Sequence, residues 1–193
     1  MRWLSLYARS RRVPAALGAA AAGAGLAWSL VAGFGSGERV GPVVLTLTVL
    51  LLVAAVTATL GGPDDSLDRT AARPWSRLRA SHLVAALGCV VVLIGAVRFG
   101  PFGFVVRDAA GLLGLTALGA VAVGPARSWF LPLGWTLGAA TFPGTGTVGE
   151  VLTWQLAAPD SRPAATVAAL LATAGLTTYA TRGPRPRTST ENP

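Results

Sequence analysis

The chain has 193 residues, of which 52% are hydrophobic and 12% are charged, and its formal net charge is +8. This composition excludes an ordinary soluble domain, because such domains carry about twice that share of charged residues. The basic residues are all arginines beside apolar runs, so anionic lipid headgroups account for the charge and no nucleic-acid partner is expected. The single cysteine, Cys89, lies inside an apolar run and is expected to be a packing thiol.

Six apolar runs predict membrane-spanning helices, because a helix needs about 20 mostly apolar residues to cross a bilayer. The predicted fold class is therefore all-α: a polytopic helix bundle in which residues 1–181 form one transmembrane domain. The first run follows an arginine-rich start but exceeds the length of a signal-peptide core, so we expect it to be retained. The fifth run is short and contains Pro132, so the sequence allows five or six spans, and we expect six. The predicted spans are residues 13–34, 42–60, 82–97, 109–123, 128–142 and 163–181.

The arginines predict the orientation of the bundle, because cytoplasmic loops carry the excess of basic residues. With six spans and a cytoplasmic N-terminus, the external side holds Arg39, Arg98, Arg107 and Arg162. Both termini are then cytoplasmic, and the polar tail of residues 182–193 is expected to be disordered. Arginine without lysine is typical of high-GC genomes, so we expect a bacterial plasma membrane. The cytoplasmic arginines are Arg2, Arg9, Arg11, Arg12, Arg69, Arg73, Arg77, Arg79, Arg127, Arg182, Arg185 and Arg187.

Small residues recur every four positions on three of the predicted spans, and such faces let helix backbones approach closely in lipid. Packing within the bundle and a seam between two copies both remain open. The small residues are Ala21, Gly25, Ser29 and Gly33 in the first span, Gly134 and Gly138 in the fifth, and Ala165, Ala169, Thr173 and Thr177 in the sixth.

The connection between the second and third spans, residues 62–80, is the largest polar segment. Asp64, Asp65 and Asp68 could present carboxylates on one helix face and hold Mg²⁺ against a diphosphate. That alternative makes the chain an intramembrane prenyl-diphosphate transferase or cyclase. However, no second aspartate cluster exists, and acids after Pro63 also fit the ordinary start of a helix. We therefore expect no metal and no cofactor, with Mg²⁺ as the alternative.

Residues 66–80 predict a short amphipathic helix on the cytoplasmic side. Leu67, Trp75 and Leu78 supply apolar anchors among regularly spaced arginines. Such a helix can dock into a groove of a soluble protein or lie on lipid headgroups. We expect partner contacts from Asp64, Asp65, Asp68, Arg69, Arg73, Trp75, Arg77, Leu78 and Arg79.

The stretch Leu67-Asp-Arg-Thr-Ala-Ala-Arg-Pro-Trp75, with Arg79, His82 and the ending Gly175-Leu-Thr-Thr-Tyr-Ala-Thr-Arg-Gly-Pro184, resembles small six-span membrane proteins of high-GC Gram-positive bacteria that pair with a separate ABC-type ATPase. The layout is similar to six-span ABC exporter permeases. In that layout residues 1–12 are an interface segment, residues 66–80 a coupling helix, and residues 143–162 an external segment able to dip into the membrane.

This resemblance implies a permease-like subunit that couples to a cytoplasmic ATPase and forms a homodimer or pairs with a sister subunit. No nucleotide-hydrolysis motif occurs, so no catalytic residue is expected in this chain. The glycine-rich residues 143–149 lack the lysine of a phosphate loop and predict an external turn.

Four ionisable residues lie nearest the membrane on the predicted external side and are candidates for a substrate path, because charges at depth are expensive and tend to be functional or paired. Arg107 and Asp108 are adjacent, so a local structural pair and a substrate contact both remain open. The candidates are Arg98, Arg107, Asp108 and Glu150.

Overall fold

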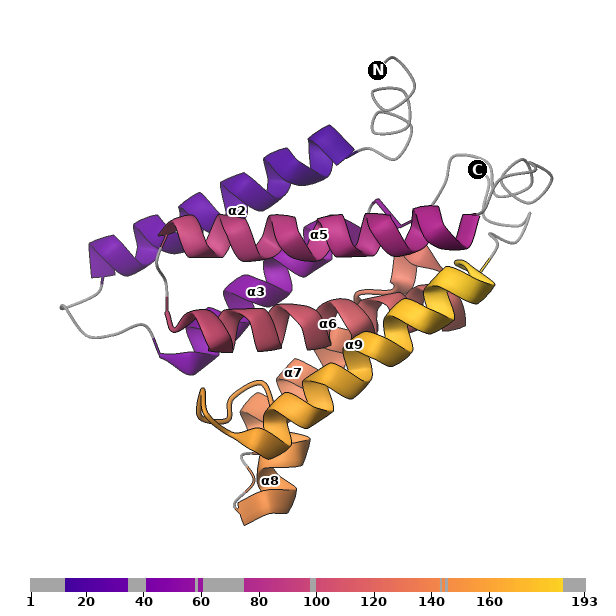
Figure 1. Ribbon diagram of the computed structural model, residues 1–193. Helices are drawn as coiled ribbons and strands as arrows, with labels where there is room; N and C mark the ends of the chain where they lie inside the picture. The colour runs from indigo at the N-terminus through magenta and orange to yellow at the C-terminus, as the bar shows by residue number, and fades with distance from the viewer. Residues whose placement is uncertain are drawn as a thin grey trace.

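The computed structural model describes residues 13–34, 41–57, 59–60, 75–97, 100–142, 144 and 146–185. These residues form helices and their connections, with no strand among them, which confirms the all-α class. The elements are α2 (Val13–Phe34), α3 (Pro42–Thr57), α5 (Trp75–Val97), α6 (Phe102–Ala122), the 3₁₀ turn η1 (Pro125–Arg127), α7 (Phe130–Thr141), α8 (Gly146–Leu152) and α9 (Arg162–Arg182) (Figure 1).

Three of these helices are long and apolar enough to cross a membrane: Trp75–Ala96, Phe102–Ala122 and Arg162–Arg182. Two shorter apolar helices cover Pro14–Gly23 and Pro42–Ala55. Large apolar side chains such as Val84, Val92 and Leu170 are exposed on the outer helices. That much exposed hydrocarbon is unfavourable in water but matches the interior of a bilayer. The chain is therefore a helical membrane protein.

Helix α6 lies at the centre of the bundle. In its apolar window 78% of residues are buried, against 22% in α5 and 22% in α9. Glycine makes this position possible, because a Cβ added at Gly114 would lie 2.3 Å from the Leu171 carbonyl oxygen of α9. A Cβ at Gly175 would meet the Gly114 carbonyl oxygen at 2.3 Å in return. The backbones of α6 and α9 thus touch where these glycines meet.

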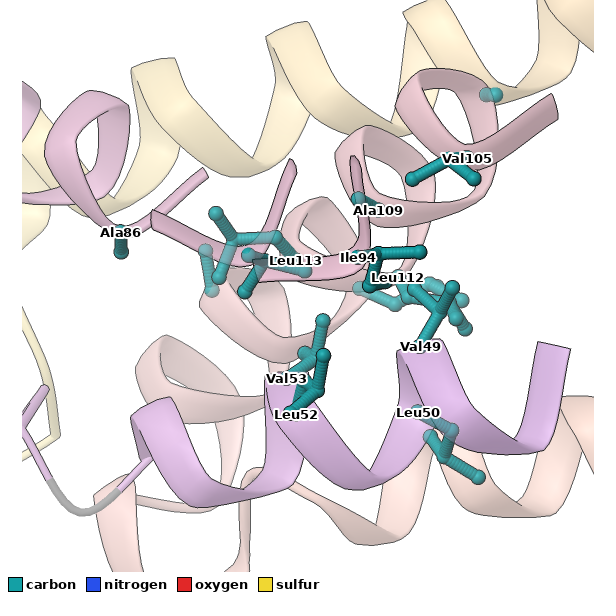
Figure 2. Packing of buried hydrophobic residues seen from close by; sticks show 14 of the residues in the cluster. Val49, Leu50, Leu52, Val53, Ala86, Ile94, Val105, Ala109, Leu112 and Leu113 are labelled. Atoms are coloured by element: carbon teal, nitrogen blue, oxygen red, sulfur yellow. The ribbon is translucent and has the colours of Figure 1, made fainter. Parts of the chain in front are cut away.

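The apolar core fills the space between α3, α5 and α6. Figure 2 shows Val49 and Val53 of α3 directed toward Ile94 of α5 and Leu112 and Leu113 of α6. Lipid removes most of the hydrophobic incentive for helices to associate, so close van der Waals contact holds them together. This contact fixes α3 beside α6, which carries the polar residues of the candidate site.

The bundle has two chemically distinct ends. Thr46 near the start of α3 bonds Asp108 near the start of α6, whereas Leu60 after α3 accepts a bond from Tyr179 near the end of α9. Helices α3, α6 and α9 therefore run in the same direction and α5 runs against them (Figure 1). Among described residues, the acids are Asp108, Glu150 and Asp160, and they define the acidic end. The arginine end carries Arg77, Arg79, Arg127, Arg182 and Arg185.

Two helices begin earlier than the sequence predicts. Helix α5 begins at Trp75, seven residues before the predicted span, and α6 begins at Phe102, seven residues before it. In both cases a charged or polar stretch joins the apolar run in one continuous helix. Hydropathy marks only the apolar part of such a helix, since backbone hydrogen bonding does not end where polarity begins.

Pro132 does not interrupt α7. The helix begins at Phe130, so the proline lies in the first turn, where its missing N–H has no helical partner to lose. At 12 residues α7 is also shorter than a spanning helix.

The predicted small-residue faces do not mediate the closest contacts. A Cβ added at Gly25, Gly134 or Gly138 would meet nothing within 4 Å. In α9, the predicted face from Ala165 to Thr177 is exposed, whereas Ala164, Ala168, Gly175 and Tyr179 are buried. The prediction that this face packs within the bundle is therefore wrong for α9, because a different face of the helix points inward.

Candidate functional site

Four polar residues meet inside the apolar bundle near its acidic end and form what we call the polar centre. They are Thr46 from α3, Arg107 and Asp108 from α6, and Gln155 from the connection between α8 and α9. Thr46, Asp108 and Gln155 are 0% exposed and Arg107 is 7% exposed. At 1.5 Å of rise per residue, Asp108 lies about 9 Å along α6 from its first residue. The polar centre is therefore enclosed by apolar helices.

Arg107 fastens the α8–α9 connection to α6. Its Nη1 donates to the Ala158 carbonyl oxygen at 2.8 Å and its Nη2 to that of Ala157 at 3.0 Å. Its Nε donates to Asp108 Oδ1 at 3.1 Å, and the guanidinium carbon lies 4.6 Å from the centre of the Phe104 ring. Charge-assisted bonds of this kind offset the cost of burying a cation. Arg107 thus acts as a structural clamp paired with Asp108.

Thr46 links three elements through one hydroxyl group. Its Oγ1 lies 2.9 Å from Asp108 Oδ2 and 3.1 Å from the Gln155 carbonyl oxygen. A hydroxyl has a single proton, so it donates to one of these oxygens at a time.

Gln155 carries the exceptional feature of the polar centre. Its side-chain Oε1 and Nε2 are both buried and have no hydrogen-bond partner among the described residues. Leaving a buried donor or acceptor unpaired costs about 1–3 kcal/mol, and such groups are rare in folded proteins. Within the described residues, the two N–H groups and the carbonyl oxygen of the amide are therefore left for a water, a ligand or another polar group.

Trp154, the residue before Gln155, shows how far the α8–α9 connection reaches into the bundle. Its side chain is fully buried, and a Cβ added at Gly111 of α6 would lie 2.3 Å from its ring. Gly111 is close to the middle of α6, so the indole reaches about half the length of that helix. The indole Nε1 also lacks a partner among the described residues.

Local contacts hold the connection in this folded-back shape. Gly144 and Gly149 touch through their backbones, where a Cβ on Gly149 would clash. Trp135 Nε1 donates to the Leu152 carbonyl oxygen at 2.9 Å. Ser161 Oγ donates to Glu150 Oε2 and accepts from Ala164 N at the start of α9. Part of the predicted glycine-rich turn is thus the helix α8.

The predicted substrate-path residues are only partly brought together. Arg107 and Asp108 were expected to flank a helix that begins at residue 109, and this boundary is wrong because α6 begins at Phe102 and buries both residues. The pair between them is confirmed at 3.1 Å. Glu150 lies apart from them, half-buried beside Ser161. Arg98 lies outside the described residues.

Only some of the predicted coupling residues lie in the part of the chain that the structure describes. Asp64, Asp65, Asp68, Arg69 and Arg73 lie outside the described residues. The others, Trp75, Arg77, Leu78 and Arg79, occupy the first turns of α5, so residues 75–80 are no part of a separate helix. Their amphipathic pattern continues directly into a helix of spanning length.

At the arginine end, Arg79 packs against α9. A Cβ added at Gly183 would lie 2.6 Å from the Arg79 guanidinium carbon, and Gly183 has a positive φ of 72°. His82 Nε2 lies 2.9 Å from Thr59 Oγ1. His82, expected at a helix start, therefore lies inside α5 and joins it to the end of α3.

Sequence reasoning missed Thr46 and Gln155. Thr46 occurs in an apolar run where threonine usually bonds its own helix, so nothing marks it. Gln155 is the only glutamine of the chain and interrupts an apolar stretch, which is a usable signal. Among the described residues, no three His, Cys, Asp or Glu side chains are grouped to hold a metal ion. The chain matches no protein-family model, no curated protein and no solved structure.

Proposed function

We propose that this chain is a permease-like subunit of an ABC-type exporter in a bacterial plasma membrane, coupled to a separate cytoplasmic ATPase. The observation that supports this best is the connection between α8 and α9, which folds back into the bundle, buries Gln155 and is held to α6 by Arg107, the partner of Asp108. A buried amide without a partner among the described residues, on a segment that a buried ion pair holds in place, fits a substrate path better than simple structural support.

The proposal includes six spans with both termini in the cytoplasm. Alternating spans require α3, α6 and α9 to run one way and α5 the other, which agrees with their observed directions. The arginine end then faces the cytoplasm, in accord with the positive-inside rule. Helix α7 covers only about 17 Å, so the fifth crossing is completed by the folded-back connection.

The continuity of α5 suggests how an ATPase acts on the polar centre. A push on residues 75–80 passes directly into α5, because Trp75 and Val97 belong to one helix. Helix α5 packs on both α3 and α6 through Val90 and Ile94, which are buried in the shared core. Tilting α5 thus shifts the helices that carry Thr46 and Asp108, and the free Gln155 amide meets the substrate.

Co-purification with the ATPase encoded by a neighbouring reading frame tests this function. We expect Arg69→Glu together with Arg73→Glu to slow association, to reduce its dependence on salt and to lower ATPase stimulation. The matched control is Arg162→Glu, an exposed arginine at the opposite end of the bundle. If the double variant binds and stimulates like wild type, or if the control fails equally, the coupling role is wrong.

The proposal assigns no catalytic residue and no cofactor to this chain. The alternative, a prenyl-diphosphate enzyme using Asp64, Asp65 and Asp68, predicts Mg²⁺-dependent consumption of a prenyl diphosphate that is lost in Asp64→Ala.

A further inference from the structure

An apolar groove opens between α5 and α9, and residues of α6 also line it. Helix α5 contributes Leu83, Val84 and Leu87, and α9 contributes Thr173 and Leu176. The groove has a volume of about 130 Å³, which is room for several methylene groups. The groove is separate from the polar centre, because Thr46, Arg107, Asp108 and Gln155 do not line it.

The groove offers nothing to a polar ligand. Its lining is almost wholly hydrocarbon, and the one hydroxyl, that of Thr173, donates within its own helix to Ala169 and Leu170 at 2.8 and 3.1 Å. Val84 is 59% exposed, so the groove is open to the bilayer. A hydrocarbon chain is the occupant that this chemistry selects.

The groove lies directly below the arginine end. Figure 1 shows α5 and α9 close together at the C-terminal end of α9 and diverging away from it. The close end is the contact between Arg79 and Gly183. Arg77 is exposed and precedes Val84 by seven residues, which is two helical turns on the same face. Its Cα is therefore about 10 Å from that of Val84 along the helix axis.

The positive charge at the arginine end favours a lipid with an anionic headgroup. Within the part of the chain that the structure describes, this end holds five arginines, and in the full sequence the segments predicted to lie at this end hold twelve arginines against the four acids Asp64, Asp65, Asp68 and Glu191. A phosphodiester lies in the headgroup layer, about 5–8 Å thick, directly above the acyl chains, so Arg77, about 10 Å beyond Val84, is at the level of a phosphate whose acyl chain lies against Val84. Basic pockets between spanning helices on the cytoplasmic side are known to hold anionic lipids.

A second copy of the chain fits the groove less well. Two copies in one membrane share an orientation, so a dimer through this groove brings two arginine-rich ends together, because the segments predicted to face the cytoplasm hold twelve arginines against four acids. A lipid phosphate removes that repulsion instead of adding to it.

We propose that the groove between α5 and α9 is a binding site for an anionic phospholipid of the cytoplasmic leaflet. One acyl chain lies against Val84, Leu87 and Leu176, and the phosphate pairs with Arg77. The choice of leaflet rests on the orientation in the proposed function, but the site requires no ATPase.

The test is native mass spectrometry of the purified full-length chain, titrated with phosphatidylglycerol or phosphatidylcholine of equal acyl length. We expect wild type to prefer phosphatidylglycerol at least about fivefold, and Arg77→Gln to reduce this preference about fivefold, the effect of one arginine near a headgroup. Val84→Trp fills the groove and removes one retained lipid of either kind.

Val92→Trp is the matched control, since Val92 is an exposed valine of the same helix outside the groove. It should retain lipid like wild type. Equal binding of the two lipids by wild type overturns the proposal, as does unchanged lipid retention in Val84→Trp. If Val84→Trp instead converts a dimer to a monomer with its lipid count intact, the groove is an interface between copies and the lipid site is wrong.

Discussion

At the scale of single residues, the unpaired amide of Gln155 is the feature that structural stability does not explain. Arg107 and Asp108 compensate each other, and Thr46 uses its hydroxyl, but Gln155 Oε1 and Nε2 remain without partners among the described residues. An apolar side chain of similar size would avoid that penalty. A buried polar residue indicates a functional role when it makes a protein less stable than an apolar residue of the same size would.

This reasoning predicts the effect of Gln155→Leu. We expect a stability gain of about 1–2 kcal/mol, because the substitution removes two buried unpaired groups and keeps the volume. Gln155→Ala should instead lower stability, because it leaves a cavity. Thermal unfolding in detergent measures both. In the proposed exporter, Gln155→Leu should also abolish substrate stimulation of the ATPase. A clear loss of stability in Gln155→Leu would show that the amide has a structural role after all.

At the scale of helices, glycine position decides which faces pack. The central helix α6 has close neighbours at Gly111, Gly114 and Gly119, which meet Trp154, the Leu171 carbonyl and the Ser128 backbone. The regular four-residue spacing in α2, α7 and α9 looked more convincing in the sequence. Periodicity reports which residues share a face, but which face turns inward depends on the neighbouring helices, and single-sequence reasoning has no access to them.

Two glycine substitutions test this difference. Gly114→Ala should destabilise the bundle by about 1–3 kcal/mol, because its Cβ would collide with backbone atoms of α9 that cannot rotate away. Gly138→Ala should be neutral or stabilising by up to about 1 kcal/mol, because its Cβ enters open space and alanine favours the helix. Thermal unfolding of the two variants in one detergent gives the comparison. Equal stabilities would contradict the crossing of α6 and α9.

At the scale of the whole molecule, the sequence predicted the all-α class, because long apolar runs are visible in it directly. Of the six predicted spans, three coincide with helices that are long and apolar enough to cross a membrane among the described residues. The polar centre could be foreseen only in part. The adjacency of Arg107 and Asp108 is a sequence fact, but their burial follows from the early start of α6 and from a connection that folds back. Thr46 and Gln155 are 109 positions apart, and only packing brings them together.

The proposed orientation is tested by labelling intact cells with a maleimide that does not cross membranes. In a Cys89→Ser background, Asp160→Cys should react from outside, because Asp160 is exposed at the acidic end. Arg182→Cys should react only after lysis, because it is exposed at the arginine end. The two labelling results depend on each other, because the single 21-residue helix α9 connects the two sites. Labelling of Arg182→Cys in intact cells would reverse the bundle, place the arginines against the positive-inside rule, and remove the cytoplasmic ATPase and the cytoplasmic-leaflet lipid as partners of this end.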